Sequence, residues 1–266
     1  MLRFMVAPFE LFWRHRLLLF QTTRNEIRGR YAGSVLGLAW LVVYPLLFLA
    51  VYALIYLYIF KVRFGLFDSN EYVILIFCGL IPFLGFAEGL SMGVSSVTSN
   101  ANLIKNTLFP VDLIPIKSVM VAQCTQVVGT GLIIFALVLL GKISTWVLLL
   151  PVIWLAQILF TFGLVWTLSS LNVFLRDLQN TIGVLILMLM MISPIAYTAD
   201  MVPDGLRPFL AINPLYYIII AYQDCLMLGR FPREGIFWVL ILMAVGSFWA
   251  GYWFFSRMKR VFADNV

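Results

Sequence analysis

The sequence predicts an all-α integral membrane protein with six transmembrane helices, and three observations lead to this prediction. Of the 266 residues, 63% are hydrophobic and 11% are charged, whereas soluble domains are about half apolar and a quarter charged. The apolar residues form long runs without alternation, which favours helices over a membrane barrel. The basic residues gather on one side of the predicted spans, as the positive-inside bias requires.

The spans are expected where apolar runs approach or exceed the roughly 20 residues that cross a bilayer. The first run is 26 residues long and carries no charge, and Pro45 inside it is a candidate kink. The fifth run lies near the lower length limit. The predicted spans are 35–60, 72–98, 115–140, 146–174, 181–197 and 235–256, together forming a transmembrane domain over 34–256.

The distribution of basic residues sets the expected topology. With both termini in the cytosol, 12 of the 18 basic residues fall on the inner side of the membrane. The segment 198–233 contains a short apolar stretch, and if it crossed the membrane, the basic tail 257–266 would face outward. The positive-inside bias opposes this. We therefore expect 198–233 to re-enter the membrane from the outer face and return, with the tail in the cytosol.

The N-terminal segment 1–33 is expected to be cytosolic and to lie along the membrane. An amphipathic interfacial helix is predicted from about Phe9 to Thr22, because apolar side chains share one arc at 100° per residue. A cleavable signal is not expected, since Arg14 and Arg16 interrupt the region where an uncharged core would lie. The residues on the apolar arc are Phe9, Phe12, Trp13, Leu17 and Phe20.

A cluster of arginines precedes the first span and is the principal candidate binding site. Arg24 and Arg28 are four residues apart and share a helix face, and Arg30 and Tyr31 follow directly. Guanidinium groups form forked hydrogen bonds with phosphate oxygens, so the cluster is a candidate site for a pyrophosphate at the inner lipid boundary. The alternative is that these arginines are simple anchors on anionic lipid.

An aromatic ladder in the first span is a second candidate site. Phe48, Tyr52 and Tyr56 recur at intervals of four residues, so they line one helix face. Aromatic rings combine an apolar face with a polar edge, which makes them candidate channel-lining platforms for sugars. The alternative is an ordinary belt of aromatic residues at the lipid interface.

Residues with catalytic or metal-binding patterns do not stand out. The sequence contains no P-loop or H-E-x-x-H motif, so we expect no catalytic site, no metal site and no ATP hydrolysis by this chain. Its net charge of +6 is attributed to cytoplasmic anchors rather than to nucleic-acid binding. Glu88 is the only acid well inside a predicted span, and pairing with another group is the favoured interpretation. The cysteines, interpreted as packing residues, are Cys78, Cys124 and Cys225.

Several motifs, in order along most of the chain, resemble one known family. The resemblance is to the permeases of bacterial polysaccharide-export ABC transporters, which are membrane subunits of O-antigen and teichoic-acid exporters, with capsule exporters as relatives. The matching motifs are Arg28–Trp40, Tyr44-Pro45-Leu46, Gly79–Phe83, Asn102–Lys105, Phe109-Pro110, Arg176-Asp177, Ser193-Pro194 and Asn213–Leu215.

The resemblance implies a transport subunit of the bacterial cytoplasmic (inner) membrane, not an enzyme. Two copies would form the channel, and each would bind a cytosolic ATPase subunit that holds ATP and Mg²⁺, so this chain itself would need no cofactor. The substrate would be a glycan on an undecaprenyl pyrophosphate carrier, docking near the arginines 24–30. The segment 99–113 would be the coupling helix seated in the ATPase, and its candidate contacts are Asn102, Leu103, Lys105, Asn106 and Asp112.

Three alternatives remain open on the sequence alone. The first is a permease for drugs or small lipids from the same superfamily, with a lateral pocket facing lipid. The second is a membrane-embedded enzyme that acts on lipid-linked sugars, although such an enzyme needs clustered acids or histidines that this sequence lacks. The third is a passive channel or scaffold that works without an ATPase.

Overall fold

A computed structural model of the chain describes residues 2–55, 69–106, 109–195, 197, 202–203, 205 and 207–262. Within these ranges the structure is helical and contains no strand, which confirms the predicted all-α class. The helices are α1 (Leu2–Arg30), η1 (Gly37–Ala39), α2 (Trp40–Leu54), α3 (Ser69–Val94), α4 (Ser96–Ser99), α5 (Ala101–Asn106), α6 (Leu113–Leu139), η3 (Thr145–Leu149), α7 (Leu150–Phe174), α8 (Leu178–Ile192), α9 (Arg207–Leu210), α10 (Pro214–Leu226), α11 (Glu234–Met258) and η5 (Lys259–Val261).

Four of the described helices are long and apolar enough to cross a membrane, and they correspond to the second, third, fourth and sixth predicted spans. They cover Glu71–Val94, Leu113–Leu139, Thr145–Phe174 and Gly235–Val261. The two remaining predicted spans correspond to shorter apolar helices at Gly37–Val51 and Leu178–Ile192. The predicted number of six spans therefore stays a prediction, and the end of the span 35–60 lies outside the described residues.

The short length of α8 has a local cause. Its 15 residues reach about 22 Å at 1.5 Å per residue, less than the roughly 30 Å of a hydrocarbon core. Pro194 follows, and the residue before a proline is driven out of the helical region. Ser193 accordingly adopts an extended conformation, with φ −75° and ψ 143°.

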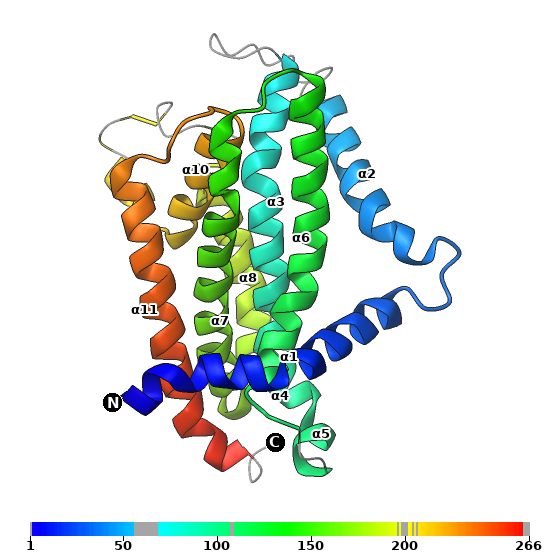
Figure 1. Cartoon of the computed structure of the whole chain (residues 1–266), viewed down its shortest axis with the longest axis vertical. Coiled ribbons are helices and arrows are strands. Elements are labelled where there is room, and N and C mark those ends of the chain that lie inside the picture. Colours follow the sequence, from blue (N-terminus) through cyan, green and yellow to red (C-terminus); the bar gives the residue numbers. More distant parts are fainter. Residues whose placement is uncertain are drawn as a thin grey trace.

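The bundle is built around α3, which is largely buried and packs against α6, α7 and α10 (Figure 1). Helices α7 and α11 pack very closely, because small residues line their contact. A Cβ at Gly163 would overlap the backbone carbonyl of Ser247, and a Cβ at Gly251 would overlap the backbone of Gly163. Small residues in this arrangement allow membrane helices to approach closely and gain dispersion and hydrogen-bond energy.

Helix α1 lies across one end of the bundle, at the same end as the chain's C-terminal helix and α5 (Figure 1). It is longer than the predicted helix from Phe9 to Thr22, because no residue ends it before Gly33, whose φ of +80° favours glycine. The helix bends at His15, where φ is −109° and ψ is 16°. Its arrangement across the bundle suits the predicted interfacial position.

The predicted coupling segment 99–113 is not one continuous helix. Helix α4 ends at Ser99, and α5 begins after Asn100 and runs from Ala101 to Asn106. Residues 109–112 are not helical, and α6 starts at Leu113. Pro110 accounts for part of this interruption, because proline lacks an amide donor and restricts the residue before it.

Helix α10 lies inside the predicted re-entrant segment and is buried among other helices. It packs against α3, α7 and α11 and lies at the bundle end opposite α1 (Figure 1). Its 13 residues reach about 20 Å, too short to cross a bilayer. Asn213 caps its start by accepting a hydrogen bond from the amide of Leu215, 3.0 Å away. Re-entry itself stays a prediction, because the structure contains no membrane, and residues 198–201, 204 and 206 lie outside the described ranges.

The close contact between α7 and α11 predicts that Gly163→Ala destabilises the protein. The added methyl group meets the backbone of α11, which cannot move aside as a flexible side chain does. We expect a cost of about 1–3 kcal/mol, typical of overpacking, and a fall of several degrees in the thermal unfolding midpoint of the purified chain in detergent.

Gly246→Ala is the matched control for this substitution. Gly246 is also a glycine within α11, but a Cβ there meets nothing within 4 Å. Alanine is a better helix former than glycine, so the midpoint should stay the same or rise. Equal midpoints for the two variants would contradict the described packing of α7 on α11.

Candidate functional site

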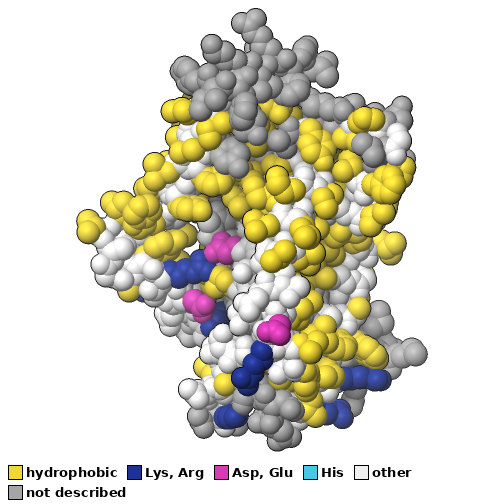
Figure 2. Space-filling view, turned by 180° about the vertical axis from the view of Figure 1, so that it is seen from behind, with side chains coloured by type: hydrophobic (Ala, Val, Ile, Leu, Met, Phe, Trp, Pro, Cys, Tyr) yellow, Lys and Arg dark blue, Asp and Glu magenta, His cyan; other side chains and the backbone are white. Residues whose placement is uncertain are grey.

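Two ion pairs hold the C-terminal end of α1 on the bundle. Glu26 pairs with Lys117 of α6 at 2.6 Å, and Arg30 pairs with Glu88 of α3. Glu26 and Arg30 are four residues apart, so they share the helix face that is turned toward the bundle. Figure 2 shows acidic and basic side chains side by side on one face, below a surface that is mainly hydrophobic.

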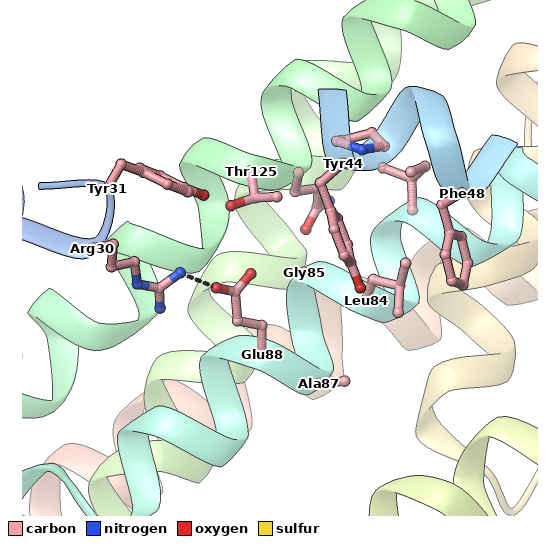
Figure 3. A pocket seen from close by; sticks show the side chains of 12 residues that line it. Arg30, Tyr31, Tyr44, Phe48, Leu84, Gly85, Ala87, Glu88 and Thr125 are labelled. Atoms are coloured by element: carbon pink, nitrogen blue, oxygen red, sulfur yellow. Dashed lines mark hydrogen bonds and ion pairs between the residues drawn. The ribbon is translucent and has the colours of Figure 1, made fainter. Parts of the chain in front are cut away.

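A cavity of about 360 Å³ lies beside the second ion pair, between the end of α1 and helices α2, α3 and α6. We call it the Arg30 hollow, and Figure 3 shows it from close by. Most of its lining is apolar, and the polar groups gather near Arg30. Its lining includes Arg30, Tyr31, Tyr44, Phe48, Glu88 and Thr125.

The Arg30–Glu88 pair occupies the charged side of this hollow. The side chains of Arg30 and Glu88 are 30% and 29% exposed, so the pair is partly open to an incoming group. The Arg30 guanidinium also donates to the sulfur of Met92, one turn along α3. The interpretation of Glu88 as a paired acid is confirmed.

The apolar side of the Arg30 hollow carries part of the predicted aromatic ladder. Phe48 lines the hollow, and Tyr44 stacks on it with ring centres 6.2 Å apart and planes inclined by 19°. Tyr44 extends the ladder by one turn of α2. The side chain of Tyr52 and the whole of Tyr56 lie outside the described residues, so their part in the ladder stays a prediction.

A network of buried polar side chains lies behind the hollow, and the candidate site derived from the sequence did not include it. Gln126 lines the hollow, donates to the hydroxyl oxygen of Tyr222 at 3.0 Å and exchanges hydrogen bonds with Gln157 at 2.9 Å. Gln157 also donates to the carbonyl of Pro82. Two glutamines within predicted spans are a signal that could have identified this network, because buried amides require partners.

Arg24 and Arg28 do not line the Arg30 hollow, although the sequence grouped the three arginines together. They lie on another face of α1, because residues two apart on a helix do not face the same way. Both line a separate cavity of about 640 Å³, which we call the Arg28 hollow, between α1, the start of α2 and α6. Their predicted contact with the substrate pyrophosphate stays a prediction.

The candidate coupling residues fall into two groups. Asn102 and Lys105 are exposed on α5, and Leu103 is half-buried, whereas the side chain of Asn106 is not described. Asp112 is only 6% exposed and accepts two hydrogen bonds of 2.8 Å from Lys259. Its backbone carbonyl accepts a further bond from the indole of Trp166. Asp112 thus joins the coupling segment to α7 and to the end of α11.

Groups that could bind a metal ion were not found in the part of the chain that the structure describes. The three cysteines are free, and Cys78 and Cys225 are buried. The Arg30 hollow combines an ion pair with an aromatic, mostly apolar lining, an arrangement suited to binding an amphipathic anion.

Comparison with known proteins identifies the family of the chain. Residues 18–227 match the family described as ABC-2 type transporter. Two proteins of Klebsiella pneumoniae named O-antigen export system permease protein RfbA are 33% and 32% identical to this chain, over 93% of it and 94% of each relative. A protein of the same name from Myxococcus xanthus is 27% identical, over 96% of this chain and 97% of that protein. The resemblance of the sequence motifs is thereby confirmed, and the chain belongs to the ABC-2 type transporter family.

Proposed function

We propose that this chain is the membrane subunit of an ATP-driven exporter of O-antigen carried on undecaprenyl pyrophosphate. The names of its relatives over nearly the whole chain support the substrate class. The observation that carries the proposal for the site is the Arg30–Glu88 pair beside an aromatic, apolar hollow. Such a site matches a ligand with an anionic head, a sugar chain and a long apolar tail.

The Arg30–Glu88 pair suits a ligand that binds reversibly. Arg30 has an internal counter-charge in Glu88, so it is neutralised when no substrate is bound. A pyrophosphate carries more charge than a carboxylate and offers several oxygens to the guanidinium fork. In this proposal the head group replaces Glu88 on Arg30, while Tyr31 lines the same hollow and lies within reach of the head group. Because the side chain of Glu88 is 29% exposed, water can solvate its released charge.

The aromatic residues then serve the sugars that follow the head group. Tyr44 and Phe48 present a stacked pair of rings in the hollow. Ring faces bind sugars weakly, so a long glycan slides past them without becoming trapped, much as ion conduction depends on weak, repeated sites. Tyr52 and Tyr56 are proposed to extend this surface along the first span.

Energy for export would come from a cytosolic ATP-binding subunit that carries ATP and Mg²⁺. In this proposal α5 seats in that subunit through Asn102, Leu103, Lys105 and Asn106. The Asp112–Lys259 pair would pass the movement on to α11, because separating the pair would leave the buried Asp112 carboxylate without a counter-charge.

A second copy of the chain and an inner-membrane location complete the proposed assembly. The positive-inside bias supports a cytosolic position for both termini, and the start of α1 and the end of α11 lie at the same end of the bundle (Figure 1).

The proposal predicts opposite effects for the two members of the Arg30–Glu88 pair. Arg30→Gln removes the guanidinium group that would bind the pyrophosphate. The carrier-glycan concentration for half-maximal ATP hydrolysis should therefore rise by about tenfold. Glu88→Gln removes the competing carboxylate, so the same concentration should fall by about threefold, consistent with a partly exposed pair. The measurement uses the complete transporter in vesicles.

Glu71→Gln is the control, because it weakens an ion pair with Lys142 outside the Arg30 hollow. If the half-maximal concentration rises for both Arg30→Gln and Glu88→Gln, the pair has only a structural role. That result would refute the proposal that the pyrophosphate replaces Glu88 on Arg30.

The proposed transmission through Asp112 and Lys259 gives a separate prediction. Lys259→Met leaves a buried carboxylate without its partner, so carrier-stimulated ATP hydrolysis should fall by about threefold or more relative to basal hydrolysis. Exchanging the two residues, with Asp112→Lys and Lys259→Asp together, should restore part of the stimulation.

Lys142→Met is the matched control for this test, since Lys142 pairs with Glu71 near the opposite end of α6. Co-purification of the ATPase subunit should be unchanged in all of these variants. Full stimulation in Lys259→Met would remove the pair from the coupling path.

A further inference from the structure

The Arg28 hollow differs from the Arg30 hollow in both size and charge. Its volume is about 640 Å³, and most of its lining is apolar, contributed by α1, the start of α2 and α6. Arginines from α1 lie at this cavity, but no acidic residue lines it. Its lining includes Phe20, Thr23, Arg24, Arg28, Leu41 and Met120.

Arg24 and Arg28 have no acidic partner within the described ranges, in contrast to Arg30. They are four residues apart, so their guanidinium groups lie on the same side of α1. Both side chains are exposed, and at an inner membrane surface such basic residues attract anionic lipid by about 1 kcal/mol each. A phosphate group also fits the guanidinium fork.

Thr23 provides an independent sign that a ligand is missing. Thr23 is only 7% exposed, and its hydroxyl has no hydrogen-bond partner in the described part of the chain. The neighbouring Thr22 is satisfied, because its hydroxyl donates to the carbonyl of Leu18 at 2.8 Å. Buried hydroxyl groups are normally paired. Since Thr23 lines the Arg28 hollow, a ligand oxygen there would satisfy it.

We propose that the Arg28 hollow holds a resident anionic glycerophospholipid, with its phosphate on Arg24 and Arg28 and an acyl chain along Leu41 and Met120. The apolar lining accounts for the chain, and the unpaired arginines account for the anionic head group. The transported carrier is less suited to this place, because it is absent between export cycles and would leave the arginines without a counter-charge. Membrane phospholipid is always present.

The test measures lipid retained by the full-length transporter after purification from vesicles that contain phosphatidylglycerol and phosphatidylcholine. Native mass spectrometry should find phosphatidylglycerol bound to each copy of the wild-type chain. In the double variant Arg24→Gln/Arg28→Gln its affinity should fall by about 30-fold, as expected for two basic residues at a lipid surface. Met120→Trp, which fills the cavity without changing charge, should also lower retention.

Arg14→Gln/Arg176→Gln is the matched control, since it removes the same charge from residues that do not line the hollow. This control should retain the lipid. Equal retention in the wild type and in Arg24→Gln/Arg28→Gln would overturn the inference. Unchanged retention in Met120→Trp would also overturn it, by placing the lipid on the surface rather than in the hollow.

A further arm separates this inference from the proposed function. Lipid retention is measured without carrier glycan or ATP, so its outcome does not depend on the proposed function. If undecaprenyl pyrophosphate displaces the phosphatidylglycerol from the wild type, the hollow belongs to the substrate and the inference fails. If Arg30→Gln leaves the carrier-glycan concentration for half-maximal ATP hydrolysis unchanged, the proposed function fails and this inference is unaffected.

Discussion

The ion pair between Arg30 and Glu88 is the constraint on which the candidate site depends. A carboxylate within an apolar helix is costly, and a guanidinium at the membrane face needs a counter-charge, so each group stabilises the other. The pair also fixes the end of α1 against α3, and the Glu26–Lys117 pair fixes it against α6. These contacts, together with the packing of Phe9 and Phe12 on α7 and α11, position α1 and shape both hollows.

The arginines of α1 thus divide into two kinds. Arg30 has an internal partner, which a stronger anion can replace, and this suits a transient substrate. Arg24 and Arg28 lack an acidic partner among the described residues, which suits an anion that stays bound permanently. In the proposed arrangement, one short helical segment presents two anion sites of different character on different faces, since residues two apart on a helix point in different directions. A transported lipid and a membrane lipid would be kept apart by this geometry.

Much of the fold was predictable from the sequence, because long apolar runs specify membrane helices with little ambiguity. The second, third, fourth and sixth predicted spans match described helices within a few residues. Details that depend on tertiary contacts were not predictable. The sequence grouped Arg28 with Arg30, although residues two apart on a helix face different ways; the packing of α1 on the bundle decides which hollow each of them lines. Asp112 was grouped with the exposed coupling residues, whereas its partner Lys259 lies 147 positions away in the sequence.

The central claim is that the carrier's pyrophosphate takes the place of Glu88 on Arg30, and a cryo-electron microscopy structure of the complete transporter with bound undecaprenyl pyrophosphate tests it most directly. The account predicts phosphate density within hydrogen-bond distance of the Arg30 guanidinium, with the Glu88 carboxylate turned away from it. An intact Arg30–Glu88 pair, with the phosphate density at any other place on the chain, would contradict the account.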